Sequence, residues 1–311
     1  MLAIFLKTLP FFLLIGLGYW AGRTRFFSEE ATAYLTKFVF YFALSAMIFR
    51  FSSSLEFSEF WDGQLVLAYL SATAFVYILA ACVGILRGLD IPTIAIEAQC
   101  SVIGNVGFLG IPMLALLLGN AAVGPVILVL TVDLIVFSSL IVILIVGYRD
   151  GRMTIGILRT IGSGLIRNPM IVSMSLGLAW SALQLPVPTP MADFLELLGA
   201  AATPGALFAI GASLASKSAE RLSIAVWLSA CKLFLHPLCV AVAVLYLFQV
   251  NQFSAGVVIA AAAMPVAGNV FILAQHYGVA PQRVSAAILV STVISIITLT
   301  GVIAWVSGYQ A

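Results

Sequence analysis

Long apolar runs dominate this chain, and their length limits what it can fold into. A membrane-spanning helix needs roughly 20 apolar residues, and on that measure the sequence holds about ten such runs. Inside hydrocarbon every backbone N–H and C=O needs an internal partner, so the runs are predicted to be helices. The predicted spans are 2–22, 31–51, 63–86, 93–118, 122–147, 168–185, 191–215, 221–248, 253–278 and 282–307. The chain is therefore predicted to be an all-α integral membrane protein.

Composition supports this class and excludes others. Only 8% of the residues are charged, whereas a soluble domain carries about 25%. The net charge of +2 comes with no basic stretch for nucleic acid. No HExxH, GxSxG or P-loop pattern occurs, so no catalytic residue and no cofactor are predicted and the protein is not expected to be an enzyme. The four cysteines lie in apolar runs without a CxxC pair, so they predict packing and no metal site.

Lysine and arginine placement predicts the orientation, because cytoplasmic loops carry the positive excess. The odd-numbered connections hold Arg23, Arg25, Arg87, Arg149, Arg152, Arg159, Arg167, Lys217, Arg221 and Arg283, and the even-numbered ones hold Arg50. The protein is therefore predicted to lie in the cell (inner or plasma) membrane, with the odd connections in the cytoplasm and both termini outside. The longest connection, 148–167, is basic and moderately apolar, which predicts a short surface helix between the segments 1–147 and 168–311.

These two segments resemble each other in sequence. Gly16–Trp20 matches Leu176–Trp180 at an offset of 160 residues, and Ile127–Val129 matches Ile288–Val290 at 161. Three further matches, between residues 46 and 205, 70 and 228, and 104 and 268, fall in the same order. A shift of five spans reverses the direction of crossing, so the halves are predicted to be inverted five-helix repeats. That architecture is typical of alternating-access transporters.

Two stretches interrupt long apolar runs with glycine, asparagine and proline. Ser101–Pro112 lies in the fourth predicted span, and Met264–Val270 lies in the ninth. Proline removes a backbone donor and glycine loosens a helix, so both spans are predicted to break near the bilayer centre. Such paired breaks indicate a transporter binding site. The candidate substrate-binding residues are Asn105, Gly107, Pro112, Pro265 and Asn269, with Lys232 considered below. The alternative is that the glycines permit close packing and the asparagines bond neighbouring helices.

Three ionisable residues lie deep inside predicted spans: Asp133, Lys232 and His236. Asp133 and Lys232 share a depth of about 16 Å from opposite ends of their spans, so they can form an intramembrane pair. Lys232 can attract an anionic substrate, or exchange a proton as Asp133 changes partner; a static salt bridge is the alternative. His236 fits a satisfied interior histidine better than a proton relay. Glu97, one turn from a cytoplasmic span end, is predicted to lie at the mouth.

The two interrupted stretches resemble the helix crossovers of the auxin efflux carrier family. Asn105–Pro112 is similar to the crossover in its fourth helix, and Met264–Phe271 to that in its ninth. Further similar segments are Leu17–Tyr19, Arg167–Pro169 and Ala202–Phe208. The resemblance implies ten helices in two inverted sets of five, as in bile acid–sodium symporters. It also implies substrate-site roles for Asn105, Asn269, Pro112 and Pro265.

By the same resemblance, the first, second, sixth and seventh helices form a scaffold and homodimer surface, and the other six form a moving transport domain. Family members carry organic anions, such as auxin, malate or malonate. Ser45 departs from the proline that relatives often have in the second helix, whereas the seventh keeps Pro204. The scaffold is therefore expected to bend differently in its two halves.

Together these features predict a secondary transporter of a small organic anion that works by elevator-type alternating access within membrane lipid. A proton, sodium or no ion at all can be coupled to it. A channel for ions or neutral solutes also explains broken helices, but it does not readily explain two buried charges at one depth. A third class, a non-transporting membrane sensor or assembly subunit, needs a partner surface, for which only the 148–167 connection is available.

Overall fold

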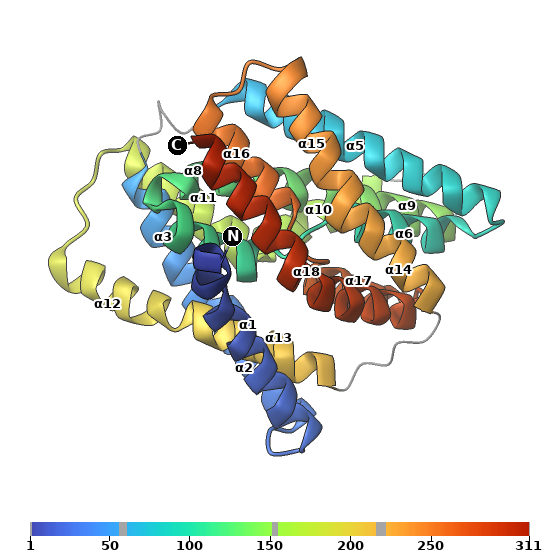
Figure 1. The fold of residues 1–311 in the computed structure, drawn as a ribbon, viewed down its shortest axis with the longest axis horizontal. Helices are drawn as coiled ribbons and strands as arrows, with labels where there is room; N and C mark the ends of the chain where they lie inside the picture. The colour runs from blue at the N-terminus through green and yellow to red at the C-terminus, as the bar shows by residue number, and fades with distance from the viewer. Residues whose placement is uncertain (1, 56–60, 151–154, 216–221, 311) are drawn as a thin grey trace.

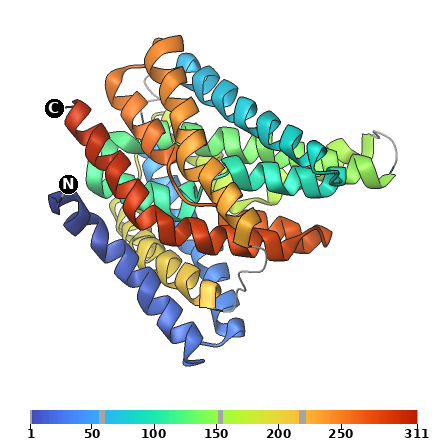
Figure 2. The same cartoon turned by 45° about the vertical axis from the view of Figure 1, so that its right-hand side comes forward.

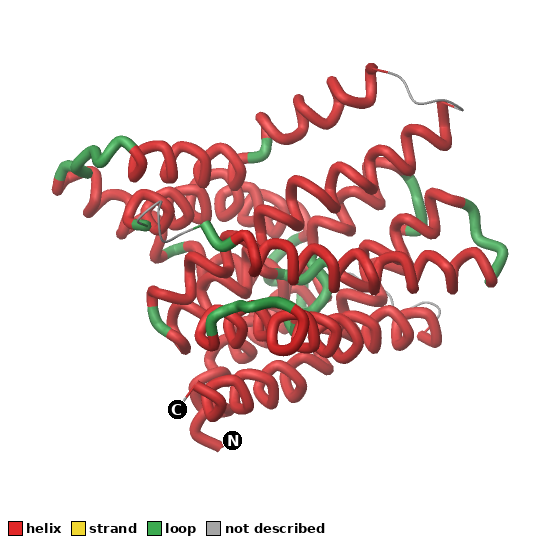
Figure 3. Tube along the Cα trace, turned by 90° about the horizontal axis from the view of Figure 1, so that it is seen from above, coloured by secondary structure: helices red, strands yellow, loops and turns green. Residues whose placement is uncertain are grey.

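The computed structural model describes residues 2–55, 61–150, 155–215 and 222–310, and this part of the chain folds into helices joined by loops. Figure 1 shows the helices packed as one bundle, and Figure 3 shows loops and no strands between them. The first half contains α1 (Leu2–Arg23), α2 (Glu29–Phe38), η1 (Val39–Ala43), α3 (Leu44–Ser54), α5 (Gly63–Leu86), α6 (Ile91–Val102), η2 (Val106–Gly110), α7 (Ile111–Leu118), η3 (Asn120–Ala122), α8 (Val123–Val132), η4 (Asp133–Phe137) and α9 (Ser138–Asp150). The rest contains α10 (Ile155–Arg167), α11 (Pro169–Ala182), α12 (Thr189–Ala200), α13 (Ala202–Ala215), α14 (Leu222–Ala230), η5 (Cys231–Leu235), α15 (His236–Val242), η6 (Ala243–Leu247), α16 (Gln252–Ala262), α17 (Gly268–Tyr277) and α18 (Pro281–Gln310).

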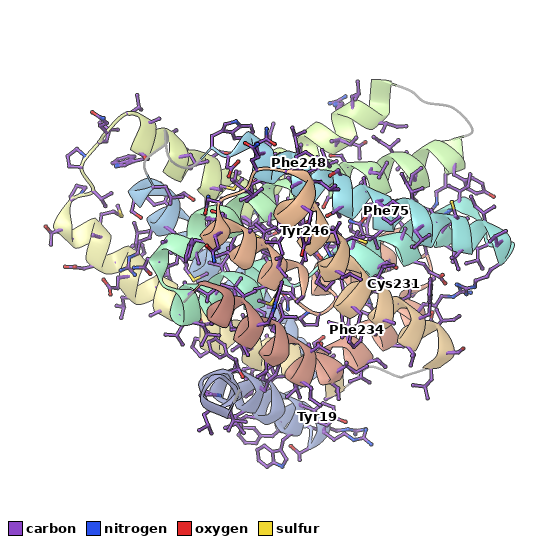
Figure 4. All side chains as sticks on the ribbon, turned by 45° about the horizontal axis from the view of Figure 1, so that its top comes forward. Tyr19, Phe75, Cys231, Phe234, Tyr246 and Phe248 are labelled. Atoms are coloured by element: carbon purple, nitrogen blue, oxygen red, sulfur yellow. The ribbon has the colours of Figure 1, made fainter. Side chains whose placement is uncertain are left out.

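Six continuous helical segments among the described residues are long and apolar enough to cross a membrane. They are Glu29–Ser54, Gly63–Leu86, Asn120–Arg149, Thr189–Ala215, Leu222–Leu247 and Pro281–Ser307. Shorter apolar helices, among them Pro169–Ala182, lie in other predicted spans. The prediction of an all-α protein with several membrane spans is therefore confirmed. Large apolar side chains such as Phe75, Phe234 and Tyr246, labelled in Figure 4, are exposed on the outside of the bundle, where lipid accommodates them.

Glycine lets two helix pairs approach until their backbones touch. In the contact of α1 with α13, a Cβ atom at Gly18 would overlap the carbonyl oxygen of Phe208, and one at Gly211 would overlap that of Ile15. In the contact of α3 with α11, a Cβ at Gly177 would lie 2.6 Å from Cβ of Ser52. Figure 2 shows α1 and α13 side by side. Small residues at such contacts are typical of helix packing in membranes, where backbone proximity provides the attraction.

Helical irregularities occur in the segment that contains Ser45 and in the segment that contains Pro204. The segment from α2 to α3 passes through the π-helical turn η1, and Ser45 donates a hydrogen bond to the carbonyl of Phe40, 3.2 Å away. The segment from α12 to α13 is interrupted at Ala201, just before Pro204. Both segments therefore deviate from a regular helix, by a π turn in one and a break before proline in the other, which agrees with the expected difference.

The predicted surface helix between the halves is present as α10, which contacts α9 and α11. Arg159 and Arg167 lie on it, whereas Arg152, Lys217 and Arg221 lie outside the described residues. The two ends of the chain lie at the same end of the molecule (Figures 2 and 3), and the hydroxyl oxygens of Thr8 and Thr300 are 3.2 Å apart. The structure thus places both ends on one side; that this side is outside the cell stays a prediction.

Candidate functional site

The predicted interruptions are present, and they meet. Helix α6 ends at Val102 before η2 begins at Val106, and α16 ends at Ala262 before α17 begins at Gly268. An antiparallel bridge joins Gly104 to Val266. The Asn105 N–H donates to the Pro265 carbonyl over 2.8 Å, and the Ala267 N–H donates to the Ile103 carbonyl over 3.0 Å. The backbone groups released by one break are thus satisfied by the other, as burial in a membrane protein requires.

Two helix N-termini begin at this junction. Asn105 precedes η2 and Ala267 precedes α17, and neither end has a side-chain cap. The first N–H groups of a helix lack intrahelical acceptors, and the end carries a partial positive charge. Both ends border a cavity of about 60 Å³. Its polar lining comes from the side chains of Asn105, Asp133, Asn168 and Asn269, and apolar side chains such as Phe40 and Met170 form much of the remaining wall.

The two asparagines differ in their surroundings. Asn105 is buried in the non-helical segment, whereas Asn269 is the second residue of α17 and is half-buried. The Asn269 Oδ1 atom is shielded from solvent and has no hydrogen-bond partner. Gly107 also lines the cavity, and a Cβ atom there would overlap the Met170 side chain. An amide with an open acceptor beside free backbone donors suits a polar ligand that both accepts and donates hydrogen bonds.

The prolines have separate positions relative to the cavity. Pro265 lies in the break itself, and its carbonyl accepts the Asn105 bond. Pro112 is the second residue of α7, buried and beyond the cavity wall; because α7 continues directly from η2, its missing N–H removes one hydrogen bond to the preceding helical turn. Neither proline is among the cavity-lining residues, so in this structure both shape the backbone beside the cavity, and their predicted role in substrate binding stays a prediction.

Lys232 holds the end of the broken helix. It is fully buried in η5, and its Nζ donates to the carbonyl of Ala262, the last residue of α16. It also bonds His236 Nδ1 at 3.1 Å. Because an ammonium only donates, Nδ1 accepts, and the protonated Nε2 faces the Thr73 hydroxyl at 3.0 Å. A cation at a helix C-terminus complements the negative end of the dipole.

The predicted contact between Lys232 and Asp133 is not formed in this conformation. Asp133 is 2% exposed, and its Oδ1 accepts a 2.9 Å hydrogen bond from the Tyr69 hydroxyl. Lys232 is bonded to Ala262 and His236 instead, although it is close enough to Asp133 to interact electrostatically. Lys232 is not among the residues that line the cavity, whereas Asp133 is. Both ring nitrogens of His236 have hydrogen-bond partners, which agrees with the prediction of a satisfied interior histidine.

Sequence reasoning did not identify three residues that the site uses. Tyr69 on α5 bonds Asp133, and Asn168 lines the cavity while its Oδ1 caps α11 through the Met170 N–H at 3.0 Å. Ser291 on α18 accepts the Val266 N–H at 3.1 Å. The Asn-Pro pair at 168–169 was an available signal, since asparagine followed by proline begins helices. Nothing comparable marks Tyr69 or Ser291.

Glu97 is the buried anion of an ion cluster with two arginines, and not the mouth residue that the sequence predicted. Its side chain is 3% exposed; Arg87 bonds one oxygen at 2.6 Å and Arg283 bonds the other. The three residues tie together α5, α6 and α18. This corrects the sequence interpretation, because proximity to a span end did not reveal that two arginines converge on the carboxylate.

We expect Glu97→Gln to lower the free energy of unfolding by about 3 kcal/mol, because a buried ion cluster that loses its anion leaves its cations uncompensated. Glu196→Gln is the matched control. Glu196 pairs with Arg50 at 3.3 Å, but their side chains are 64% and 46% exposed, so the loss should be about 0–1 kcal/mol. Thermal unfolding of both purified variants in detergent measures the difference; equal midpoints would contradict it.

Comparison with known proteins identifies the class. The model of a family described as "Membrane transport protein" matches residues 3–303. This chain belongs to that family, the auxin efflux carriers. It is 30% identical over 302 residues to a protein of Rhizobium meliloti (strain 1021) named "Putative malonate transporter", with 95% of this chain and 93% of that protein aligned. This auxin efflux carrier family member is accordingly a multi-pass membrane transporter and not an enzyme.

Proposed function

We propose that this protein is a secondary transporter of a small organic anion, a carboxylate such as malonate or malate or an auxin-like acid, and that the anion binds in the cavity between the two breaks. The observation that carries the proposal is the convergence of two uncapped helix N-termini on that cavity. Free N–H groups and positive dipole ends are suited to a carboxylate. The name of the Rhizobium protein supports malonate as the first substrate to test.

The fold supports ten spans in two inverted repeats. If a repeat relates the first five spans to the last five, α1 corresponds to α11 and the α2–α3 segment corresponds to the α12–α13 segment. The contact between α1 and α13 then has its counterpart in the contact between α11 and α3, and both contacts are present. At the breaks, Gly104 pairs with Val266, 162 residues later, and this separation falls within the 158–164 residues that separate the matching segments of the two halves. The two breaks therefore meet at corresponding places, as expected of inverted repeats.

An elevator movement fits the contacts between the two proposed parts. The scaffold comprises α1, α2–α3, α11 and α12–α13, in which glycine brings the backbones together. Near the cavity the scaffold meets the other helices through larger, apolar side chains. Phe40 stacks on Phe108 with ring centroids 6.0 Å apart, and Met170 contacts Gly107. Stacked rings and flexible methionine tolerate sliding better than a hydrogen-bonded contact. We further propose a homodimer formed through the scaffold, in the inner or plasma membrane with both termini outside.

Uptake of radiolabelled malonate into proteoliposomes tests the site. We expect Asn105→Ala and Asn269→Ala each to reduce uptake more than about tenfold, because each removes a buried hydrogen-bonding group worth on the order of 1–3 kcal/mol. Asn120→Ala, an exposed asparagine of η3, is the control and should transport normally. Uptake should saturate and show counterflow, as expected of a carrier and not of a channel. Normal uptake by both site variants would place the binding site elsewhere.

A further inference from the structure

The Asp133 carboxylate has one oxygen bonded and one open. Tyr69 donates to Oδ1, while Oδ2 is buried without a hydrogen-bond partner. Asp133 lines the same cavity as Asn105 and Asn269. An unpaired carboxylate oxygen out of water is strongly disfavoured, and the effect is larger for a charge than for a neutral group. A proton on Oδ2 is the smallest occupant that neutralises the group.

The groups around Asp133 leave its Oδ2 atom without a hydrogen-bond donor. From α5 comes the Tyr69 hydroxyl, and from η5 comes Lys232, which is close enough to interact electrostatically; His236 on α15 packs against the Tyr69 ring. Lys232 already donates to the Ala262 carbonyl and to His236. The remaining polar groups around the cavity come from the α6–η2 break, from α17 and from the start of α11, and they are the neutral amides of Asn105, Asn269 and Asn168.

A carboxylate substrate in this cavity would meet the Asp133 charge at close range. Two like charges about 5 Å apart at an effective dielectric constant of about 20 weaken binding by on the order of 100-fold. The cavity is about 60 Å³, so the two anions have little room to separate. Protonation of Asp133 removes this repulsion, which links occupancy by the anion to occupancy by a proton.

The backbone at Asp133 is also unusual. Asp133 is the first residue of the π-helical turn η4, and Ser138 donates to its carbonyl at 3.1 Å. Lys232 lies in a second π-helical turn, η5. Single π-helical turns inside α-helices are frequent at functional sites, although η1 and η6 show that this chain also has them elsewhere. Both buried charges therefore lie where the helix has departed from its regular form.

We propose that Oδ2 of Asp133 is the coupling-proton site of this carrier, where a proton binds and is released together with the anionic substrate. The proposal rests on the transport function above. The proton comes from the solvent on the side of entry, forms an O–H bond with Oδ2 and returns to solvent on the side of exit. Anion and proton thus move in the same direction, one proton per anion.

The experiment uses the full-length protein in proteoliposomes, with malonate as the probe and the membrane potential clamped at zero. With the interior about one pH unit more alkaline, the wild-type protein should accumulate malonate about tenfold over its equilibrium level, because one pH unit is one factor of ten per coupled proton. Asp133→Asn keeps the acceptor for Tyr69 but cannot take up a proton. It should lose the pH-driven accumulation; its exchange of malonate at equal concentrations is measured alongside, so that accumulation is compared with the exchange that each protein retains.

Asp62→Asn is the matched control, since Asp62 caps α5 at 2.9 Å and asparagine caps equally well. It should accumulate malonate like the wild type. Because the Asp133 variant can fail to fold, proton uptake is also measured on the wild-type protein in detergent, at a pH alkaline enough to ionise Asp133 in the empty protein, where malonate binding should take up about one proton per site.

Accumulation by Asp133→Asn, accumulation that follows a sodium gradient instead of the pH gradient, or malonate binding without proton uptake would each overturn the proposal while leaving a carrier in place. No malonate exchange by the wild-type protein would instead reject malonate as the substrate under the proposed function.

Discussion

Gly18→Leu will prevent the protein from assembling its α1–α13 contact. A Cβ at this position would overlap the Phe208 carbonyl oxygen and would lie 2.9 Å from the Phe208 carbonyl carbon. Both atoms belong to backbone, so no side-chain rotation relieves the overlap and the helices must separate. Overpacking commonly costs about 1–3 kcal/mol, and a displaced helix pair is expected at or above the upper end. Size-exclusion chromatography of the detergent-solubilised variant should show aggregate in place of a single folded species.

Gly16→Leu is the matched control on the same helix. Nothing lies within 4 Å of a Cβ atom at Gly16, and the residue is exposed. Leucine is also a better helix former than glycine, by about 0.8 kcal/mol, so this variant should be as stable as the wild type or slightly more stable. If both leucine variants behave alike, the glycine contact does not define the scaffold.

Lys232→Met will remove both stability and transport. Methionine has a similar length, so the change tests the charge and its hydrogen bonds more than the volume. It leaves the Ala262 carbonyl at the end of α16 without its donor, and it leaves His236 Nδ1 unpaired. The loss of one partner from such a buried charged network costs about 3–5 kcal/mol. We expect a lowered thermal midpoint and strongly reduced malonate uptake, because the end of α16 borders the break that forms the cavity.

Lys37→Met is the control for this charge. Lys37 is exposed on α2, where its ammonium lies 5.5 Å from the ring centroid of Tyr34. An exposed cation–π contact is worth about 0.5–1 kcal/mol, so uptake should change little. A Lys232 variant that keeps the wild-type midpoint but loses uptake would show that the lysine acts on the substrate directly and not by holding α16.

The breaks could be predicted from the sequence because they depend on local chemistry. Gly104 and Pro265 disfavour helix wherever they lie, and no tertiary contact is needed to see this. The residues that pair across the two breaks could not be predicted in this way. The repeated Gly-Asn-Val triplets suggested an offset of 164 residues, whereas the bridge joins residues 162 apart. Asn105 and Asn269 are therefore not equivalent, because Asn105 lies in the non-helical segment before η2 and Asn269 lies in helix α17.

The hydrogen-bond partners of the two buried charges could not be predicted from the sequence either. Helical rise gave the shared depth of Asp133 and Lys232, but depth does not specify which neighbour each side chain meets. Lys232 is attracted by the C-terminus of α16, an acceptor that exists only because that helix ends at Ala262. Tyr69 then provides the donor that Asp133 needs. These choices follow from how α5, η4, η5 and α16 pack around the junction, and no spacing in the sequence encodes them.

The junction between the two breaks is held by main-chain atoms of Ile103–Asn105 and Pro265–Ala267. Bonds of this kind do not depend on the identity of the side chains beside them. Replacing Phe40 or Met170 can therefore alter the size and polarity of the pocket without undoing the crossover. Selectivity and architecture are thus separable in this molecule, and an engineer seeking a carrier for a different acid can begin at those walls.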